Sequence, residues 1–265
     1  MEKLKRFVDN ELKHTSLNSP PRSLDAPPRI FSNIEQLFSL CGIKKQRILG
    51  TNLQRFLHLR VKAGSHVYLS NDKCESIYFI YSGFLKNTWA DIQGNEKVID
   101  FPMKNEIVGL DGVANKKYVN SLKALTDSEL IAIPLEFFNR RDIASDMFRG
   151  HIISIMSQQL INQQKSAFVI SSLPVDAKVA KFLLNLSFKF KSLGYSEKSF
   201  LLRMSREEIG SYLGVSLETV SRAISGLCKI GVLKKDHRSI EIINFDALKK
   251  LKRLPPGTTY KSIPK

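Results

Sequence analysis

The sequence contains little cysteine, and its three cysteines, Cys41, Cys74 and Cys228, lie far apart. A disulfide framework or a CxxC metal site needs cysteines in even sets at short, regular spacing. The five histidines show no ligand spacing with the cysteines either. The sequence therefore predicts free thiols in a reducing compartment and no metal centre.

Long apolar runs are also absent. No stretch approaches the roughly 18–20 apolar residues needed to cross a bilayer. The N-terminal sequence MEKLKRFVDNELKH lacks the apolar core of a signal peptide. We therefore expect a cytoplasmic protein with no membrane partner.

Common enzyme motifs are missing as well. The sequence has no GxSxG, P-loop, GxGxxG or HExxH motif, and its carboxylates show no acid–base pairing. The sequence therefore does not favour an enzyme.

Acidic residues are scarce relative to basic ones. The 265 residues include 41 Lys and Arg against 25 Asp and Glu, a formal net charge of +16. Residues 175–265 carry +10 of this charge, and the longer segment 1–174 carries +6. Such an excess favours a polyanionic partner, because phosphate contacts dominate nonspecific nucleic-acid affinity. We expect the nucleic-acid contact in the C-terminal third of the chain.

The chain divides into segments that differ in composition and residue pattern. Four prolines before residue 30 indicate an extended tail, and a short amphipathic helix follows from Ile34 to Leu40. From Phe56 to Pro134, short β-branched and aromatic runs alternate with turn signals such as Gly94-Asn95. Many short strands at regular spacing predict a β-roll or barrel.

Residues 146–173 predict one long helix, which Pro174 ends. Between His151 and Pro174 the only charged residue is Lys165. A narrow stripe at alternating spacings of three and four residues is typical of a coiled-coil seam, and it favours packing against the same helix of a second copy. The alternative is a helix packed on its own domain. The expected dimer-interface residues are Ile153, Met156, Leu160, Gln163, Ala167 and Ile170.

The segment LLRMSREEIGSYLGVSLETVSRAISGLCKIGVL, residues 201–233, predicts two short helices joined by a glycine turn. Ser205 can cap the first helix with Glu208 completing a capping box, Gly214 ends it, and Ser216 caps the second helix. This is the helix-turn-helix signature, in which the second helix enters the major groove. The core-facing residues of the second helix are Val220, Ile224 and Leu227.

The next segment, VLKKDHRSIEIINFDALKKL, predicts a basic β-hairpin, or wing. With this wing, the motif MSREEIGSYLGVSLETVSRAISGL resembles that of the Crp/Fnr superfamily of bacterial transcription regulators, and the resemblance extends from about residue 35 to 250. It implies an α+β fold with an N-terminal β-roll like a cyclic-nucleotide-binding domain, a long dimerisation helix and a C-terminal winged helix-turn-helix. The expected divisions are a flexible tail at 1–33, the β-roll at 34–145, the dimerisation helix at 146–173, the DNA-binding domain at 174–254 and a flexible tail at 255–265.

The resemblance also implies how DNA is read. The E-x-x-S-R spacing of Glu218, Ser221 and Arg222 resembles the Fnr branch, whereas the cyclic-AMP receptor branch differs at Leu217 and Ser221. The implied half-site is TTGAT-like. The chemistry agrees, because Arg can bind guanine through a bidentate fork and Glu can accept from cytosine. The expected phosphate contacts, which position the protein without specifying sequence, are Ser205, Arg206, Ser216, Thr219, Lys234 and Lys235.

The sensor features of the family are altered. Cyclic-nucleotide-binding members hold ribose and phosphate with a Gly-Glu pair and an Arg-Ser pair, whereas this sequence has Gly109-Leu110-Asp111 and Val119-Asn120-Ser121. Lys116 and Lys117 could replace the charge of the missing Arg but lack its planar fork. We therefore expect a regulator that works without cyclic AMP.

Oxygen-sensing members resembling this sequence hold an iron-sulfur cluster through three N-terminal cysteines and a fourth in the roll. Here only Cys41 lies in the N-terminal segment, and the fourth position is Ile131. The sequence therefore predicts no cluster and no other cofactor. Cys228, towards the DNA-facing side of the second helix, has either no role or a redox role in which Lys229 lowers the pKa of the thiol.

The direction of regulation is suggested by one loop. In this family surface loops of the roll touch RNA polymerase, and ADIQGNEK, residues 90–97, resembles one such loop. We therefore expect an activator that binds double-stranded DNA as a homodimer and contacts RNA polymerase. The alternatives are an effector-dependent repressor of the same family and a nonspecific DNA-binding protein.

Overall fold

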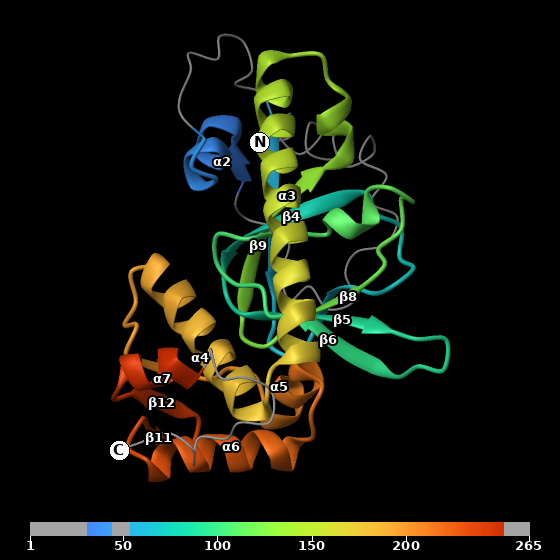
Figure 1. Cartoon of the computed structure of the whole chain (residues 1–265). Coiled ribbons are helices and arrows are strands. Elements are labelled where there is room, and N and C mark those ends of the chain that lie inside the picture. The colour runs from blue at the N-terminus through green and yellow to red at the C-terminus, as the bar shows by residue number, and fades with distance from the viewer. Residues whose placement is uncertain (1–30, 44–53, 252–265) are drawn as a thin grey trace. The chain divides into compact units, whose positions relative to one another are not determined.

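The structure, a computed structural model, describes residues 31–43 and 54–251 (Figure 1). These residues form two compact units. The first contains the described residues up to Trp89 and the segment Pro102–His151, and the second contains Ala90–Phe101 and the described residues from Ile152 onward. The predicted C-terminal tail and the first 30 residues of the predicted N-terminal tail lie outside the described residues.

Short antiparallel strands form the predicted β-roll. They pair in two sheets, of order β1-β2-β9-β4-β7 and β3-β8-β5-β6. The strands are β1 (Phe31–Asn33), β2 (Arg55–Val61), β3 (His66–Tyr68), β4 (Ser76–Ser82), β5 (Leu85–Ala90), β6 (Glu96–Asp100), β7 (Ile107–Val108), β8 (Ser121–Ala124) and β9 (Ser128–Pro134).

The middle of the first sheet is buried on both faces. Alternate residues of a strand point to opposite faces, and Tyr78, Ile80 and Leu130 belong to the apolar cluster inside the roll. Their neighbours Ile77 and Ile131 are fully buried on the other face. Burial on both sides explains why IYFI, residues 77–80, is a continuous apolar run and does not alternate.

The described N-terminal residues correct one expectation. Phe31–Asn33 form β1, which pairs antiparallel with β2, so the predicted tail of residues 1–33 does not include its last three residues. The helix α2 (Ile34–Leu40) begins and ends where the sequence predicted. Asn33 caps it in a capping box: the Asn33 side-chain oxygen accepts the N–H of Gln36, and the Gln36 side-chain oxygen accepts the N–H of Asn33, both at 2.9 Å.

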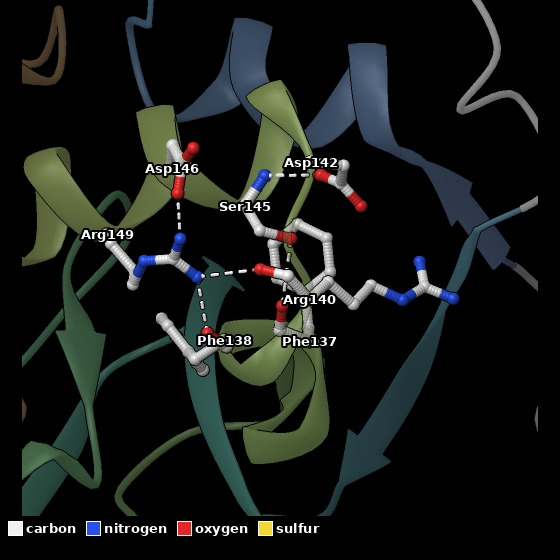
Figure 2. Close-up of polar contacts among 7 residues, drawn as sticks. All are labelled: Phe137, Phe138, Arg140, Asp142, Ser145, Asp146 and Arg149. Atoms are coloured by element: carbon white, nitrogen blue, oxygen red, sulfur yellow. Dashed lines mark hydrogen bonds and ion pairs between the residues drawn. The ribbon is translucent and has the colours of Figure 1, made fainter.

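The predicted long helix is α3 (Ile143–Ser172), which begins three residues before the expected start. The Asp142 carboxylate accepts the N–H of Ser145 at 2.8 Å, and the Ser145 hydroxyl donates to the carbonyl oxygen of Phe137 at 2.9 Å (Figure 2). Phe137 lies in η2 (Leu135–Asn139), the turn that follows β9. The start of α3 is therefore capped by its own approach segment.

Arg149 fixes the same junction one turn later (Figure 2). Its guanidinium donates to the carbonyl oxygen of Arg140 at 3.0 Å and to that of Phe138, and it pairs with the carboxylate of Asp146 on the preceding turn. Two backbone carbonyls and one carboxylate therefore bind the guanidinium of Arg149, and these contacts connect the first turns of α3 to the end of the roll.

The second unit contains the predicted winged helix-turn-helix. Its strands form a three-stranded sheet of order β10-β12-β11. None of the helices in residues 31–43 and 54–251 is both long and apolar enough to cross a membrane. The elements are α4 (Val175–Ser192), β10 (Ser199–Leu201), α5 (Arg206–Leu213), α6 (Leu217–Lys229), β11 (Leu233–Asp236), β12 (Ser239–Ile242) and α7 (Phe245–Leu251).

The segment Ala90–Phe101, which contains β6, packs with this unit. The N–H of Val98 donates to the hydroxyl of Ser211 on α5 at 2.9 Å. The ring of Phe101 lies 5.7 Å from that of Tyr212 and 6.1 Å from that of Phe182. A hairpin that the sequence placed in the roll thus contributes apolar and polar contacts to the helix-turn-helix unit.

Candidate DNA interface

The first helix of the motif begins and ends as the sequence predicted. The Ser205 hydroxyl accepts the N–H of Glu208 at 3.0 Å, and the Glu208 carboxylate accepts the N–H of Ser205 at 2.7 Å. Gly214 ends α5 in the left-handed region with φ of 67°. This conformation is accessible to glycine without a steric penalty, so Gly214 sets the direction in which the chain enters α6.

Gly210 lets the turn pass close to α5. A β carbon at this position would stand 2.6 Å from the carbonyl oxygen of Val215. The N–H of Val215 donates back to the carbonyl oxygen of Gly210 at 3.0 Å. The helix and the turn therefore touch through backbone atoms alone.

Gly210→Ala is expected to lower the free energy of unfolding by about 1–3 kcal/mol, because the added methyl group meets backbone that must shift. Gly150→Ala in α3 is the matched control, since a β carbon there meets nothing within 4 Å. The control should raise stability by about 0.5–1 kcal/mol, the usual gain on replacing a helical glycine by alanine. Urea unfolding of both variants measures the difference, and equal effects would contradict the close contact.

The second helix, α6, presents its apolar face to the core. Ser216 caps it by accepting the N–H of Thr219 at 3.3 Å. Val220, Ile224 and Leu227, the three residues predicted to face the core, are all buried. The buried face fixes the rotation of α6 and therefore determines which side chains remain on its opposite face.

The opposite face carries the predicted base-reading residues. Glu218 and Arg222 are exposed and Ser221 is half-buried. Arg222 donates to the hydroxyl of Thr219 at 3.2 Å. Hydrogen bonds from its own backbone N–H and from Ser216, together with the charge of Arg222, lower the pKa of Glu218. An ionised carboxylate and a guanidinium one turn apart therefore form a surface that can accept and donate hydrogen bonds.

The wing is a hairpin of β11 and β12, which are paired from Leu233 and Ile242 to Asp236 and Ser239. Lys234 and Lys235 are exposed on β11. The Lys235 ammonium donates to the hydroxyl of Ser225 on α6 at 2.9 Å. The wing is thereby joined to the helix on the side of Ser221 and Ser225, which adds positive charge beside the predicted base-reading face.

Arg206 is placed differently from the other predicted phosphate contacts. Its Nη1 atom is buried and has no hydrogen-bond partner among the described residues. Burial and the nearby charge of Arg238 lower the pKa of Arg206. Because Nη1 is inaccessible to a phosphate in this conformation, a phosphate contact from Arg206 needs its remaining guanidinium nitrogens or a different rotamer.

Cys228 lies two turns beyond Ser221 on α6. Burial raises the pKa of its thiol, and the charges of Lys235 and Arg206, rather than that of Lys229, act in the opposite direction. A raised pKa means less thiolate at neutral pH, and the thiolate is the form that peroxide oxidises. The redox role of Cys228 stays a prediction, with Lys235 and Arg206 in place of Lys229 as the nearby charges.

Most of the predicted interface of α3 is exposed in the single chain. Ile153, Met156 and Leu160 are exposed, as are the uncharged Gln163 and Ala167. Ile170 is half-buried and lies against the turn at Gly214, so it already packs within its own chain.

The helical surface adds two residues that the sequence pattern missed. Ile161 is 43% exposed and Phe168 is 62% exposed. A strict a/d spacing excludes both, although a wider helical face includes them. We call the exposed large apolar residues of α3 from Ile153 onward the α3 stripe: Ile153, Met156, Leu160, Ile161 and Phe168.

Among residues 31–43 and 54–251, no three His, Cys, Asp or Glu side chains lie where they could hold a metal ion together. Cys41 follows α2 and Cys74 lies in the roll core, and burial raises the thiol pKa of Cys41 to about 12 and that of Cys74 to about 11.

Comparison with known proteins agrees with this geometry. Residues 177–251 match the Crp-like helix-turn-helix domain family, and residues 58–141 match the cyclic nucleotide-binding domain family. The transcriptional regulatory protein btr of Bordetella pertussis is 36% identical over 193 residues, which cover 73% of this chain and 80% of btr. The transcriptional activator protein FnrA of Stutzerimonas stutzeri is 30% identical over 69% of this chain and 75% of FnrA.

Solved structures share the fold. FixK2 from Bradyrhizobium japonicum matches with a TM-score of 0.68 at 21% identity, over 75% of this chain and 98% of FixK2. A CRP-family regulator from Thermus thermophilus matches with a TM-score of 0.60 at 16% identity, over 74% of this chain and 97% of that protein. With a β-roll, a long helix and a winged helix-turn-helix in this order, the chain belongs to the Crp/Fnr family of DNA-binding transcription regulators.

Proposed function

We propose that this protein binds a palindrome of TTGAT-like half-sites as a homodimer and activates transcription without cyclic AMP or an iron-sulfur cluster. The observation that carries the proposal is the face of α6 on which Glu218, Ser221 and Arg222 lie, held by the Ser216 cap and by the bond from Lys235 to Ser225. These contacts are all local to the second unit, so the reading surface is formed before DNA binds.

The chemistry of this face fits a half-site that contains a G·C pair among A·T pairs. A guanidinium can donate two hydrogen bonds to O6 and N7 of guanine, and an ionised carboxylate can accept from N4 of cytosine. Ser221, beside Glu218 on the surface of α6, can contact a neighbouring base or the thymine methyl group. The other predicted contacts, Ser205, Ser216, Thr219 and Lys234, lie at helix N-termini or on the wing, where they suit phosphate binding.

The α3 stripe supports the homodimer. In a single chain, the five large apolar side chains of the α3 stripe are exposed to water. In a homodimer, the stripes of two copies can cover each other across a two-fold axis. The low charge of this part of α3 avoids repulsion between the copies, since only Lys165 is charged between His151 and Pro174. A two-fold dimer reads two half-sites about one helical turn of DNA, roughly 34 Å, apart.

The loop of residues 90–97 supports contact with RNA polymerase. The side-chain amide of Asn95 donates to the Asp91 carboxylate at 2.8 Å, and the backbone N–H groups of Asn95 and Gln93 donate to it at 2.9 Å. These bonds lower the pKa of Asp91. Ile92, the residue after Asp91, is fully exposed. A turn fixed by internal hydrogen bonds that presents an apolar side chain is suited to bind another protein, and the relative FnrA is named a transcriptional activator.

A competition assay tests the proposal. Labelled duplex with two TTGAT half-sites is bound at about 0.15 M salt, and unlabelled duplex of the same composition with scrambled half-sites competes. Specific regulators prefer their sites by about 10³-fold or more. A preference below about tenfold would instead support a nonspecific DNA-binding protein, which the net charge of +16 would suit.

Lys235→Ala is expected to weaken binding to both duplexes by the same factor. A lost phosphate contact reduces the slope of log affinity against log salt by about 0.9 per half-site, because one fewer counterion is released. Lys249→Ala is the matched control, since Lys249 belongs to α7 and not to a wing strand, and it pairs with Asp246 of the same helix. Titration at several salt concentrations measures the slope, and a loss of affinity confined to the TTGAT duplex would show that Lys235 acts through sequence reading, directly or through its bond to Ser225, and not through a phosphate.

A further inference from the structure

One carboxylate joins the two loop segments that replace the nucleotide-binding pairs of the family. Asp111, on the short helix η1 (Leu110–Gly112), accepts the N–H groups of Val119 and Asn120 at 3.0 and 2.9 Å. Gly109, in the left-handed region with φ of 85°, starts the turn that brings Asp111 to this position. Two consecutive backbone donors therefore converge on one carboxylate oxygen.

Consecutive backbone N–H groups that point to one spot form an anion-binding concavity. The domain containing these residues matches the cyclic nucleotide-binding family, and phosphate is the anionic part of such a ligand. In this chain the donors of Val119 and Asn120 are already bonded to an anion that the protein supplies. The side chain of Val119 is apolar and exposed, so it adds no charge for a second anion.

The groups around this loop are also bonded within the protein. The Ser121 hydroxyl accepts the N–H of Ser70 at 2.9 Å. The Tyr118 hydroxyl donates to the carbonyl oxygen of Ser76 at 2.6 Å, and the ring of Tyr118 stacks on that of Tyr68 with 3.8 Å between centroids. Stacked, buried rings stand directly behind the loop that Asp111 closes.

We propose that the carboxylate of Asp111 is a built-in substitute for the phosphate of an effector, and that it holds the β-roll loop in its bound form without a ligand. This inference rests on the proposed function, because it explains how a regulator of this family can act without cyclic AMP. It assigns the role of a bound anion to a side chain of the protein itself.

Asp111→Ala is expected to lower the melting temperature by at least about 6 °C, since two hydrogen bonds to a charged acceptor are lost. Sodium acetate or sodium phosphate at tens of millimolar should restore at least half of this loss, because a small anion can enter the vacated position. For the wild-type protein, the melting temperature in these salts should equal that in sodium chloride of the same ionic strength. Failure of both anions to restore the variant would overturn the proposal.

Two further variants serve as a control for carboxylate loss and as a test of the role of the charge. Asp127→Ala removes a carboxylate that accepts a single backbone N–H, that of Ala63, and it should show no anion-dependent recovery. Asp111→Asn keeps the position filled and loses the charge, so it should melt below the wild type and should not respond to acetate. An Asp111→Asn protein as stable as the wild type would show that the charge is not needed, even if Asp111→Ala does not fold.

Measurements with cyclic AMP and with DNA distinguish failure of this inference from failure of the proposed function. Cyclic AMP at 1 mM, a probe concentration chosen at roughly a thousandfold above micromolar affinity, should leave the wild-type melting temperature unchanged. Stabilisation by cyclic AMP would overturn the inference and would implicate the buried Tyr68 hydroxyl, which has no hydrogen-bond partner among the described residues. Absence of sequence-specific DNA binding by the wild type would reject the proposed function alone, because the melting experiments need no DNA.

Discussion

Leu160→Glu is expected to convert the proposed homodimer to monomers and to remove the proposed specific DNA binding at the same time. Leu160 is 57% exposed in the single chain and lies at the centre of the α3 stripe. Burying a large aliphatic side chain contributes about 1.5–3 kcal/mol, and a two-fold dimer contains two copies of Leu160. The substitution also places two carboxylates close together in an apolar interface, which adds to the loss.

The expected loss of dimer affinity is therefore at least about 10²- to 10⁴-fold. Asn162→Glu is the matched control, because it introduces the same charge at an exposed position on the opposite side of α3. Sedimentation at micromolar concentration should show monomers for Leu160→Glu and dimers for the control. A Leu160→Glu protein that stays dimeric would show that the α3 stripe is not the dimer interface.

The accuracy of the sequence predictions depended on how local each signal was. The caps at Ser205 and Ser216 and the turn at Gly214 were predicted correctly, because each is decided by residues within one helical turn. The buried face of α6 was also predicted, since Val220, Ile224 and Leu227 recur at helical spacing.

Features that depend on distant residues were not predicted. The strand at Phe31–Asn33 exists because it pairs with β2, and no local pattern marks it. The segment Ala90–Phe101 groups with the helix-turn-helix unit through Ser211 and Tyr212, which lie more than 100 residues further along the chain. Helical spacing likewise did not reveal that Ile170 packs within its own chain.

The candidate site shows the same limit. The sequence identified Glu218, Ser221 and Arg222 through their spacing, and all three lie on the face that α6 leaves outside the core. It could not show that the Nη1 atom of Arg206 is buried, because that depends on tertiary packing. Nor could it show that Asp111 bonds two N–H groups eight and nine residues away, since that depends on a turn geometry that spacing alone does not specify.

Arg222→Ala is expected to remove the preference for TTGAT-containing DNA while nonspecific binding persists. A bidentate contact to guanine contributes about 1–3 kcal/mol of discrimination in each half-site. A dimer has two half-sites, so the preference over scrambled duplex should fall by about 30-fold to 10⁴-fold. Competition between labelled TTGAT duplex and unlabelled scrambled duplex, measured by fluorescence anisotropy at fixed salt, gives this ratio directly.

The conservative variant separates charge from geometry. Arg222→Lys keeps the positive charge near the phosphates but loses the planar fork that pairs with O6 and N7 of guanine. We therefore expect Arg222→Lys to bind scrambled duplex as well as the wild type does and to lack most of the preference for TTGAT. The hydroxyl of Thr219, which accepts from Arg222 in the unbound protein, loses that partner in the alanine variant, so a melting curve should confirm that α6 remains folded. If Arg222→Ala retained the wild-type preference for TTGAT duplex, bases would have to be read by another part of the protein.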